Sequence, residues 1–275
     1  MKSFAARRTL GLGLTLLIAA GMILLNSLAS NHVGHTAHVS GWSLLALIVF
    51  LTSYHIRKAV PFLPLGSSSA WLQLHIYTGL LTSVLFLIHV GYSIPDGAFE
   101  SLLALVYFAV FLSGLGGLYM TRSFPARLTM LGHEVIFEQI PVVQRELQDQ
   151  IEALVLVGHS ETDTSAIAEF YRNQIRPFLI GHHDLASQLT RGTSLRWHRL
   201  SRAIEDQKRY LADDERRLMD DVRVIAHRKY LLDTQDALQG ALKLWLFFHI
   251  PATWALLILA AFHSLLVHAW SGGLP

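Results

Sequence analysis

Five long apolar runs interrupt the sequence and set its basic organisation. A bilayer core about 30 Å thick requires roughly 20 residues of helix to cross it. By that measure the sequence predicts five transmembrane helices, at residues 9–28, 41–56, 69–92, 101–120 and 244–269, the second being the shortest. We therefore expect an all-α protein, a transmembrane helix bundle of five spans.

The segment between the fourth and fifth runs has a different character. It is dense in Arg, Asp and Glu, and it shows no period-two pattern of the kind that strands produce. Near its end, apolar residues recur at helical spacing, at Leu211, Leu218, Val222 and Ile225. The sequence thus predicts three parts: spans one to four in residues 1–122, a helical insert in 123–240, and the fifth span with a short C-terminus in 241–275. The last polar helix could continue through Gly240 into the fifth span.

Basic residues mark one side of the membrane. They precede the first span, follow the second and follow the fourth, at Lys2, Arg7, Arg8, Arg57, Lys58, Arg122 and Arg127. The loops 31–40 and 91–100 contain neither Lys nor Arg. The positive-inside rule then places residues 123–240 in the cytoplasm and the C-terminus outside. We expect a multi-pass protein in contact with lipid in the cell membrane, with the bacterial inner membrane favoured.

The first span has a second interpretation. Ser27-Leu28-Ala29 resembles the small-residue cleavage site of a signal peptide. The apolar run before it is long for a signal core, so a retained helix is favoured. The orientation of the other four spans is the same either way.

Composition excludes several kinds of chemistry. The chain is 52% hydrophobic and only 15% charged, and its net charge of +2 comes with acids interleaved among the Arg residues, which argues against a nucleic-acid partner. The absence of cysteine excludes disulfides, iron–sulfur clusters, zinc–thiolate sites and covalent c-type haem attachment. Fifteen histidines remain as candidate ligands, and several of them lie inside apolar runs.

Histidines in the third and fifth spans follow one pattern. Trp71, His75 and His89 have the same spacing as Trp245, His249 and His263. In both sets, the first histidine is four positions after the tryptophan and the second histidine is fourteen positions after the first. Fourteen helical residues bring the chain back to within roughly 40° of the same face, about 21 Å further along. Each helix therefore presents two imidazoles on one face, one near each membrane surface.

The topology makes the third and fifth spans parallel. His75 then faces His249 on the cytoplasmic side, and His89 faces His263 on the outer side. Two opposed imidazoles are what axial ligation of a haem iron requires, so we expect two non-covalent haem b groups. A lone histidine in a span more often bonds to a neighbouring helix, and a proton relay would require Asp or Glu, which these spans lack.

This pair of spans resembles the dihaem cytochrome b architecture of ferric reductases, NADPH oxidases and the cytochrome b of quinol-oxidising complexes. The resemblance implies that His75, His89, His249 and His263 are haem-iron ligands and that the protein carries electrons, as a subunit of an oxidoreductase complex without catalytic residues of its own. The sequence departs from the first two families in lacking a flavin or nicotinamide motif and in its large polar insert. The donor is then a redox partner protein docked on the cytoplasmic domain, or a quinol.

Other residues leave alternatives open. His32, His35 and His38 form a run in an outer loop that suits copper, zinc or nickel, although such runs are more often polar loops. That run would suit a metal-ion transporter, and the polar insert would suit a membrane anchor or sensor. His268 is expected on a different face from His263, as a reserve ligand or an interfacial group. Small residues in the fourth span favour close approach of a helix or ligand, at Gly114, Gly116 and Gly117.

Three further groups are ambiguous. Basic residues at the cytoplasmic edge could pair with haem propionates or could only satisfy the positive-inside rule, namely Arg57, Lys58, Arg122 and Lys243. Pro251 could bend the fifth span around a haem or could be an incidental first-turn proline. His55, His182 and His183 are not expected to be ligands.

Overall fold

The computed structural model describes residues 4–28, 33–59, 67–132, 135–161, 165–180 and 195–271. Within these ranges the chain is helical and contains no strand, which confirms the all-α prediction. Among the described residues, five helices are long and apolar enough to cross a membrane. Four of them contain a whole predicted run, and the third contains all but the last three residues of its run. The protein therefore has the character of a multi-pass membrane protein. The chain divides into two units, one of residues Met1–Tyr119 with Trp245–Pro275 and one of residues Met120–Leu244.

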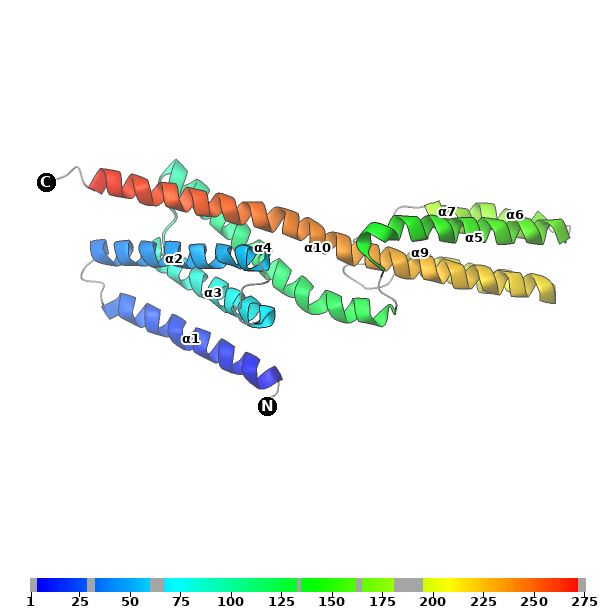
Figure 1. Ribbon diagram of the computed structural model, residues 1–275, viewed down its shortest axis with the longest axis horizontal. Coiled ribbons are helices and arrows are strands. Elements are labelled where there is room, and N and C mark those ends of the chain that lie inside the picture. Colours follow the sequence, from blue (N-terminus) through cyan, green and yellow to red (C-terminus); the bar gives the residue numbers. More distant parts are fainter. Residues whose placement is uncertain are drawn as a thin grey trace. The chain divides into compact units, whose positions relative to one another are not determined.

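The membrane-type unit consists of three whole helices and parts of two others. These are α1 (Phe4–Leu28), α2 (Val33–Ala59), α3 (Ser68–His89), the first part of α4 (Ala98–Met130) and the last part of α10 (Asp213–Ser271). Both α1 and α2 pack against α3 (Figure 1). The core is formed by Leu44, Ile48, Leu85, Phe86, Ala104, Tyr107 and Leu256. Outward-facing residues are also apolar: Leu16 and Leu17 are 70% and 71% exposed, as suits a lipid environment.

Helix α3 ends at His89, three residues before the predicted end of the span. Gly91 has a φ of 62°, a left-handed conformation that glycine adopts without steric cost. The amide of Val90 donates to the carbonyl of Phe86, and that of Gly91 donates to Ile88. His89 is thereby held on the last turn of α3.

Helix α10 runs without interruption from Asp213 to Ser271, which confirms the predicted continuation through Gly240. Asp213, Asp214 and Glu215 occupy its first turn, where carboxylates interact favourably with the helix dipole. Pro251 lies deep inside this helix, so the interpretation as a first-turn proline is wrong. The error arose because the start of the apolar run is not the start of the helix.

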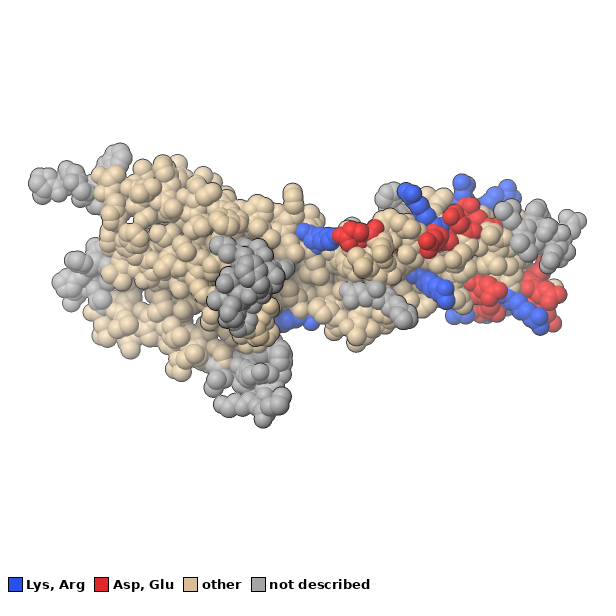
Figure 2. All heavy atoms as spheres, in the orientation of Figure 1, with Lys and Arg blue, Asp and Glu red and all other residues tan. Residues whose placement is uncertain are grey.

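The polar unit has its own core, formed by short helices around the first part of α10. They are α5 (Ile140–Glu161), α6 (Ser165–Phe170), a π-helical turn (Tyr171–Ile175), α7 (Arg176–Ile180) and α9 (Leu195–Lys208), with a 3₁₀ turn (Phe137–Gln139) before α5. The predicted apolar stripe is confirmed, since Leu211 and Val222 are buried while Leu218 and Ile225 pack against them. Figure 2 shows Lys, Arg, Asp and Glu on the surface of this unit.

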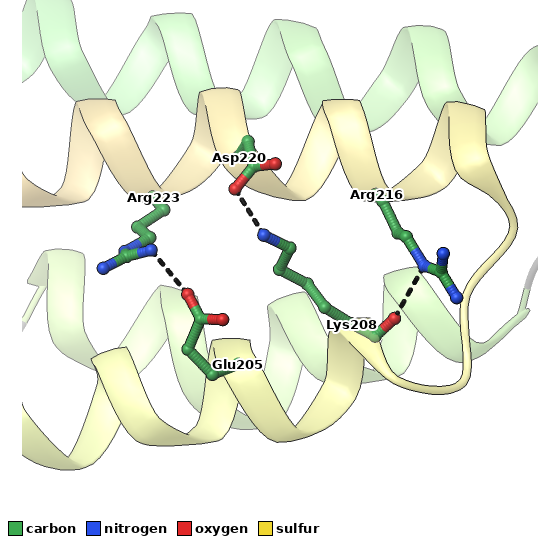
Figure 3. A network of polar contacts seen from close by, with 5 residues as sticks. All are labelled: Glu205, Lys208, Arg216, Asp220 and Arg223. Carbon is green, nitrogen blue, oxygen red and sulfur yellow. Dashed lines mark hydrogen bonds and ion pairs between the residues drawn. The ribbon is translucent and has the colours of Figure 1, made fainter.

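Ion pairs join α9 to α10 along their exposed edge (Figure 3). Lys208 Nζ lies 2.6 Å from Asp220, Arg223 pairs with Glu205, and Arg216 Nε donates to the Lys208 carbonyl. Exposed pairs of this kind contribute about 0.2–1 kcal/mol each. A buried pair lies further along α10, where Lys229, 2% exposed, donates to Asp233, which also accepts from Gln144. Burial without that partner would cost several kcal/mol, so these residues hold the polar core together.

Candidate functional site

A cavity lies among helices α2, α3, α4 and α10. It is at the end of the membrane-type unit where His89 is located. Its volume is about 110 Å³, and it is open to the outside. Most of its wall is apolar, including Leu44, Ile48, Phe86, Leu103, Tyr107 and Leu256. The side chains of His89 and His263 both line it. This is a largely apolar recess with two imidazoles, a combination that suits a metal-containing cofactor.

The distance between these two histidines is close to the distance that shared axial ligation requires. Their ring centres lie 6.4 Å apart and their planes are inclined by 88°. An imidazole nitrogen binds a metal ion at about 2.0 Å, and the ring centre lies roughly 1.1 Å behind it, so opposed rings on one ion have centres about 6 Å apart. Perpendicular planes are compatible with this, because each ring can rotate about its metal–nitrogen axis. Phe99 stacks on His263 at 6.2 Å and restricts its orientation.

Polar contacts of the Nδ1 atom hold the His89 imidazole in place. That nitrogen lies 3.2 Å from the Ala37 carbonyl and 3.3 Å from Ser40 Oγ, both on α2. A hydrogen bond from the second ring nitrogen to a carbonyl is the usual support of a metal-bound histidine. A Cβ atom at Gly41 would lie 2.9 Å from His89 Cε1, closer than real side chains approach. The imidazole therefore occupies space that a side chain at position 41 would need, and a larger residue there would require His89 to shift.

His249 has similar support from α4. It is 7% exposed, and its Nδ1 lies 2.6 Å from Ser113 Oγ. Trp245 stacks on its ring at 5.3 Å and donates its indole hydrogen to the Ser113 carbonyl. Gly117 provides the space for this indole, as the close approach predicted for the small residues of the fourth span implies.

His75 lies in different surroundings. Its ring is 5.1 Å from that of Tyr54 on α2. Trp71, four residues before it, stacks on Phe50 of α2, whereas Trp245 stacks on its own histidine. The equal tryptophan offsets in the sequence therefore do not give equal contacts. The structure brings His89 and His263 together, and the pairing of His75 with His249 stays a prediction.

Stacked aromatic rings occupy the region between the levels of His89 and His249. Phe86, one turn before His89, lies parallel to Tyr107 at 4.2 Å, and Tyr107 lies parallel to Phe111 at 6.3 Å. Phe111 is two residues before Ser113, the partner of His249. The Tyr107 hydroxyl donates to Thr82, so this ring carries no unsatisfied polar group into the apolar interior.

The outer rim of the cavity contains two further histidines. His268 lies 5.3 Å from His38 and 5.5 Å from Trp42, ring centre to ring centre. His263 and His268 are five residues apart on α10, and both line the cavity. The lining residues of α10 form a stripe wide enough to include both, at Leu256, Ala260, His263, Ser264, Val267 and His268.

The structure gives no support to a metal site in the outer histidine run. His32 lies outside the described residues, and nothing is described of the His35 side chain. In the part of the chain that the structure describes, no three His, Cys, Asp or Glu residues are grouped as metal ligands. His182 and His183 also lie outside the described residues.

The basic residues that could pair with haem propionates are only partly described. Nothing is described of the side chains of Arg57 and Lys58, nor of that of His55. Lys243 donates to Glu138 within the polar unit, and this hydrogen bond lowers the pKa of that carboxyl. Lys243 also lies 3.9 Å above the ring of Phe137. Its observed partners are thus protein groups.

Sequence reasoning missed Ser40, Gly41 and Ser113. The available signal was a polar hydroxyl followed by glycine at or inside an apolar span, at Ser40-Gly41 and again at Ser113-Gly114.

Comparisons of the chain with models of protein families, with curated proteins and with solved structures found no match.

Proposed function

We propose that the protein is a membrane cytochrome b that holds two non-covalent b-type haems and passes electrons across the bilayer. His89 and His263 hold one haem, and His75 and His249 hold the other. The observation that carries the proposal is the pair of imidazoles 6.4 Å apart in an apolar cavity. The helices that bear them each carry a second histidine fourteen residues away.

The residues present fit this cofactor in several respects. Imidazole is a common axial ligand of haem iron, and attachment is non-covalent because the chain has no cysteine. A bound haem would supply one-electron redox chemistry. The protein supplies the ligands, hydrogen bonds that orient them, and side chains that exclude water. Stacking of Phe86, Tyr107 and Phe111 keeps the space between the two levels dry and closely packed.

The electron donor is a separate molecule in this proposal. The sequence contains no flavin or nicotinamide motif, so electrons come from a redox partner protein or from a quinol in the lipid phase. The polar unit, with its charged surface, provides the docking platform for the partner. The protein then acts as the electron-transfer subunit of an oxidoreductase complex in the cell membrane, with the polar unit in the cytoplasm.

The topology is tested by cysteine labelling, because the native chain has no cysteine and any introduced thiol is unique. Ile94, 87% exposed, lies in the loop predicted outside, and Tyr210, 85% exposed, lies in the turn between α9 and α10. In intact cells, a membrane-impermeant maleimide should label Ile94→Cys and not Tyr210→Cys. Permeabilisation should make both reactive. Labelling of Tyr210→Cys alone in intact cells would reverse the proposed orientation.

The cofactor is tested by analysis of the purified protein. Two ligand pairs should give two haems per chain, extractable into acidified organic solvent because no thioether bond holds them. Pyridine haemochrome spectra and a protein assay give the ratio. A ratio near one, or pigment that stays on the denatured polypeptide, would contradict the proposal. A colourless protein rich in bound transition metal would support a metal-handling function in its place.

A further inference from the structure

Two serines make the same pair of hydrogen bonds in different helices. Ser40 donates its hydroxyl hydrogen to the carbonyl of Ala37, at 3.0 Å, and Ser113 donates to the carbonyl of Val110, at 2.8 Å. Each hydroxyl has one hydrogen and two lone pairs. Each is also close to a histidine nitrogen, Ser40 to His89 Nδ1 and Ser113 to His249 Nδ1. With the hydroxyl hydrogen on the carbonyl, the serine oxygen accepts and Nδ1 donates.

This arrangement fixes the tautomer of both imidazoles. A neutral imidazole carries one hydrogen, so a hydrogen on Nδ1 leaves the lone pair on Nε2. For His89 the Ala37 carbonyl, which can only accept, requires the same tautomer. Nε2 is therefore the nitrogen that can bind a metal ion in both residues.

A glycine follows each serine and faces the same imidazole. A Cβ atom at Gly41 would lie 2.9 Å from His89 Cε1, and one at Gly114 would lie 3.8 Å from His249 Cε1. The first distance is too short for any side chain, and the second is an ordinary contact. In each Ser-Gly dipeptide, the serine orients Nδ1 and the glycine stands beside the adjacent ring carbon.

Serine in membrane helices often bonds to its own backbone without further purpose. Ser43, Ser53 and Ser83 do so, donating to Val39, Phe50 and Leu80. This common bond to the helix backbone accounts for the hydroxyl hydrogens of Ser40 and Ser113. It does not explain why each serine oxygen lies beside a histidine nitrogen. The two histidines belong to different predicted pairs, so each pair has one member held in this way.

We propose that Ser40 and Ser113 are positioning residues, each fixing the tautomer and orientation of one axial ligand, and that Gly41 leaves the room His89 needs. This inference rests on the proposed haem function. Ser40 serves the haem of His89 and His263, and Ser113 serves the haem of His75 and His249. A hydrogen bond to Nδ1 also makes the ligand more basic, which favours ferric iron.

The serines are tested by alanine replacement in the purified full-length protein. Ser113→Ala should weaken binding of the His249 haem about tenfold or more and raise its midpoint potential, leaving the other haem unchanged. Ser40→Ala should do the same to the His89 haem. Ser113→Thr, which keeps the hydroxyl, should restore the wild-type potential. Ser43→Ala is the matched control in α2 and should change neither haem.

The glycines give a graded test. Gly41→Ala should displace His89 and cause loss of its haem, whereas Gly114→Ala should have the milder effect, because its Cβ meets Cε1 at ordinary contact distance. Haem retention after gel filtration measures both. Equal retention in the two variants would contradict the role given to Gly41.

Nitrogen-15 NMR of histidine-labelled protein, stripped of cofactor, separates this inference from the proposed function. His89 and His249 should show the Nδ1–H tautomer, and Ser40→Ala and Ser113→Ala should each increase the other tautomer at one histidine. If the wild-type protein binds no haem, the proposed function is refuted. The tautomer signals would still show whether Ser40 and Ser113 accept hydrogen bonds from the histidines. Haem-loaded alanine variants with wild-type retention, potential and tautomer would overturn the inference.

Discussion

Replacing either His89 or His263 with alanine is expected to remove one haem per chain and leave the other in place. The two imidazoles lie 6.4 Å apart and line one cavity, so each variant leaves that site with a single ligand. In the proposed pairing, the remaining haem is held by His75 and His249, each fourteen residues away on the same helix. Pyridine haemochrome analysis should show a fall from two haems to one, and a redox titration should show that one component is lost.

The double variant His89→Ala/His263→Ala should resemble either single variant. Residues that act as one unit give non-additive losses, whereas independent residues give losses that add. His268→Ala is the matched control, because His268 lines the same cavity near the rim. It should retain two haems. Loss of a haem in His268→Ala, with retention in His263→Ala, would assign the ligand to His268 and refute the proposed pair.

Hydropathy was sufficient to predict the five helices that are long and apolar enough to cross a membrane. An apolar run long enough to cross a bilayer is a strong signal because it sums over many residues. The apolar stripe that includes Leu211 and Val222 was a similarly strong signal, because several residues contribute to it. Both residues are buried in the polar unit. The ends of helices were harder to predict. Helix α3 ends at His89 because Gly91 and Tyr92 adopt left-handed conformations, which hydropathy does not register.

The surroundings of the histidines could not be predicted from their spacing. Ser113 and His249 lie 136 positions apart, and their contact depends on how α4 packs against α10. Trp71 and Trp245 precede their histidines by the same interval, yet the neighbouring helix offers Phe50 to one and Gly117 to the other. Spacing along one helix determines which face a residue occupies. It does not determine what the neighbouring helix places opposite that face.

The largest loss of pigment is expected when one member of each predicted pair is removed. His89→Ala/His249→Ala takes one ligand from each haem and should leave a protein with neither. His75→Ala/His249→Ala, which changes the same number of histidines within one pair, should retain the haem of His89 and His263. Optical spectra of the two purified double variants, at equal protein concentration, measure the difference.

This comparison tests the parallel arrangement of the third and fifth spans directly. Parallel spans place His75 and His249 at one level, so changes to these two should be non-additive with each other and additive with changes to His89. The Ile94→Cys labelling reaction, carried out in each variant, shows that the chain still inserts with the same topology. If His89 proves non-additive with His249, and His75 with His263, the spans are antiparallel and the proposed pairing is wrong. A variant that keeps both haems after loss of His89 and His249 would exclude these two histidines as ligands and refute the proposed pairing.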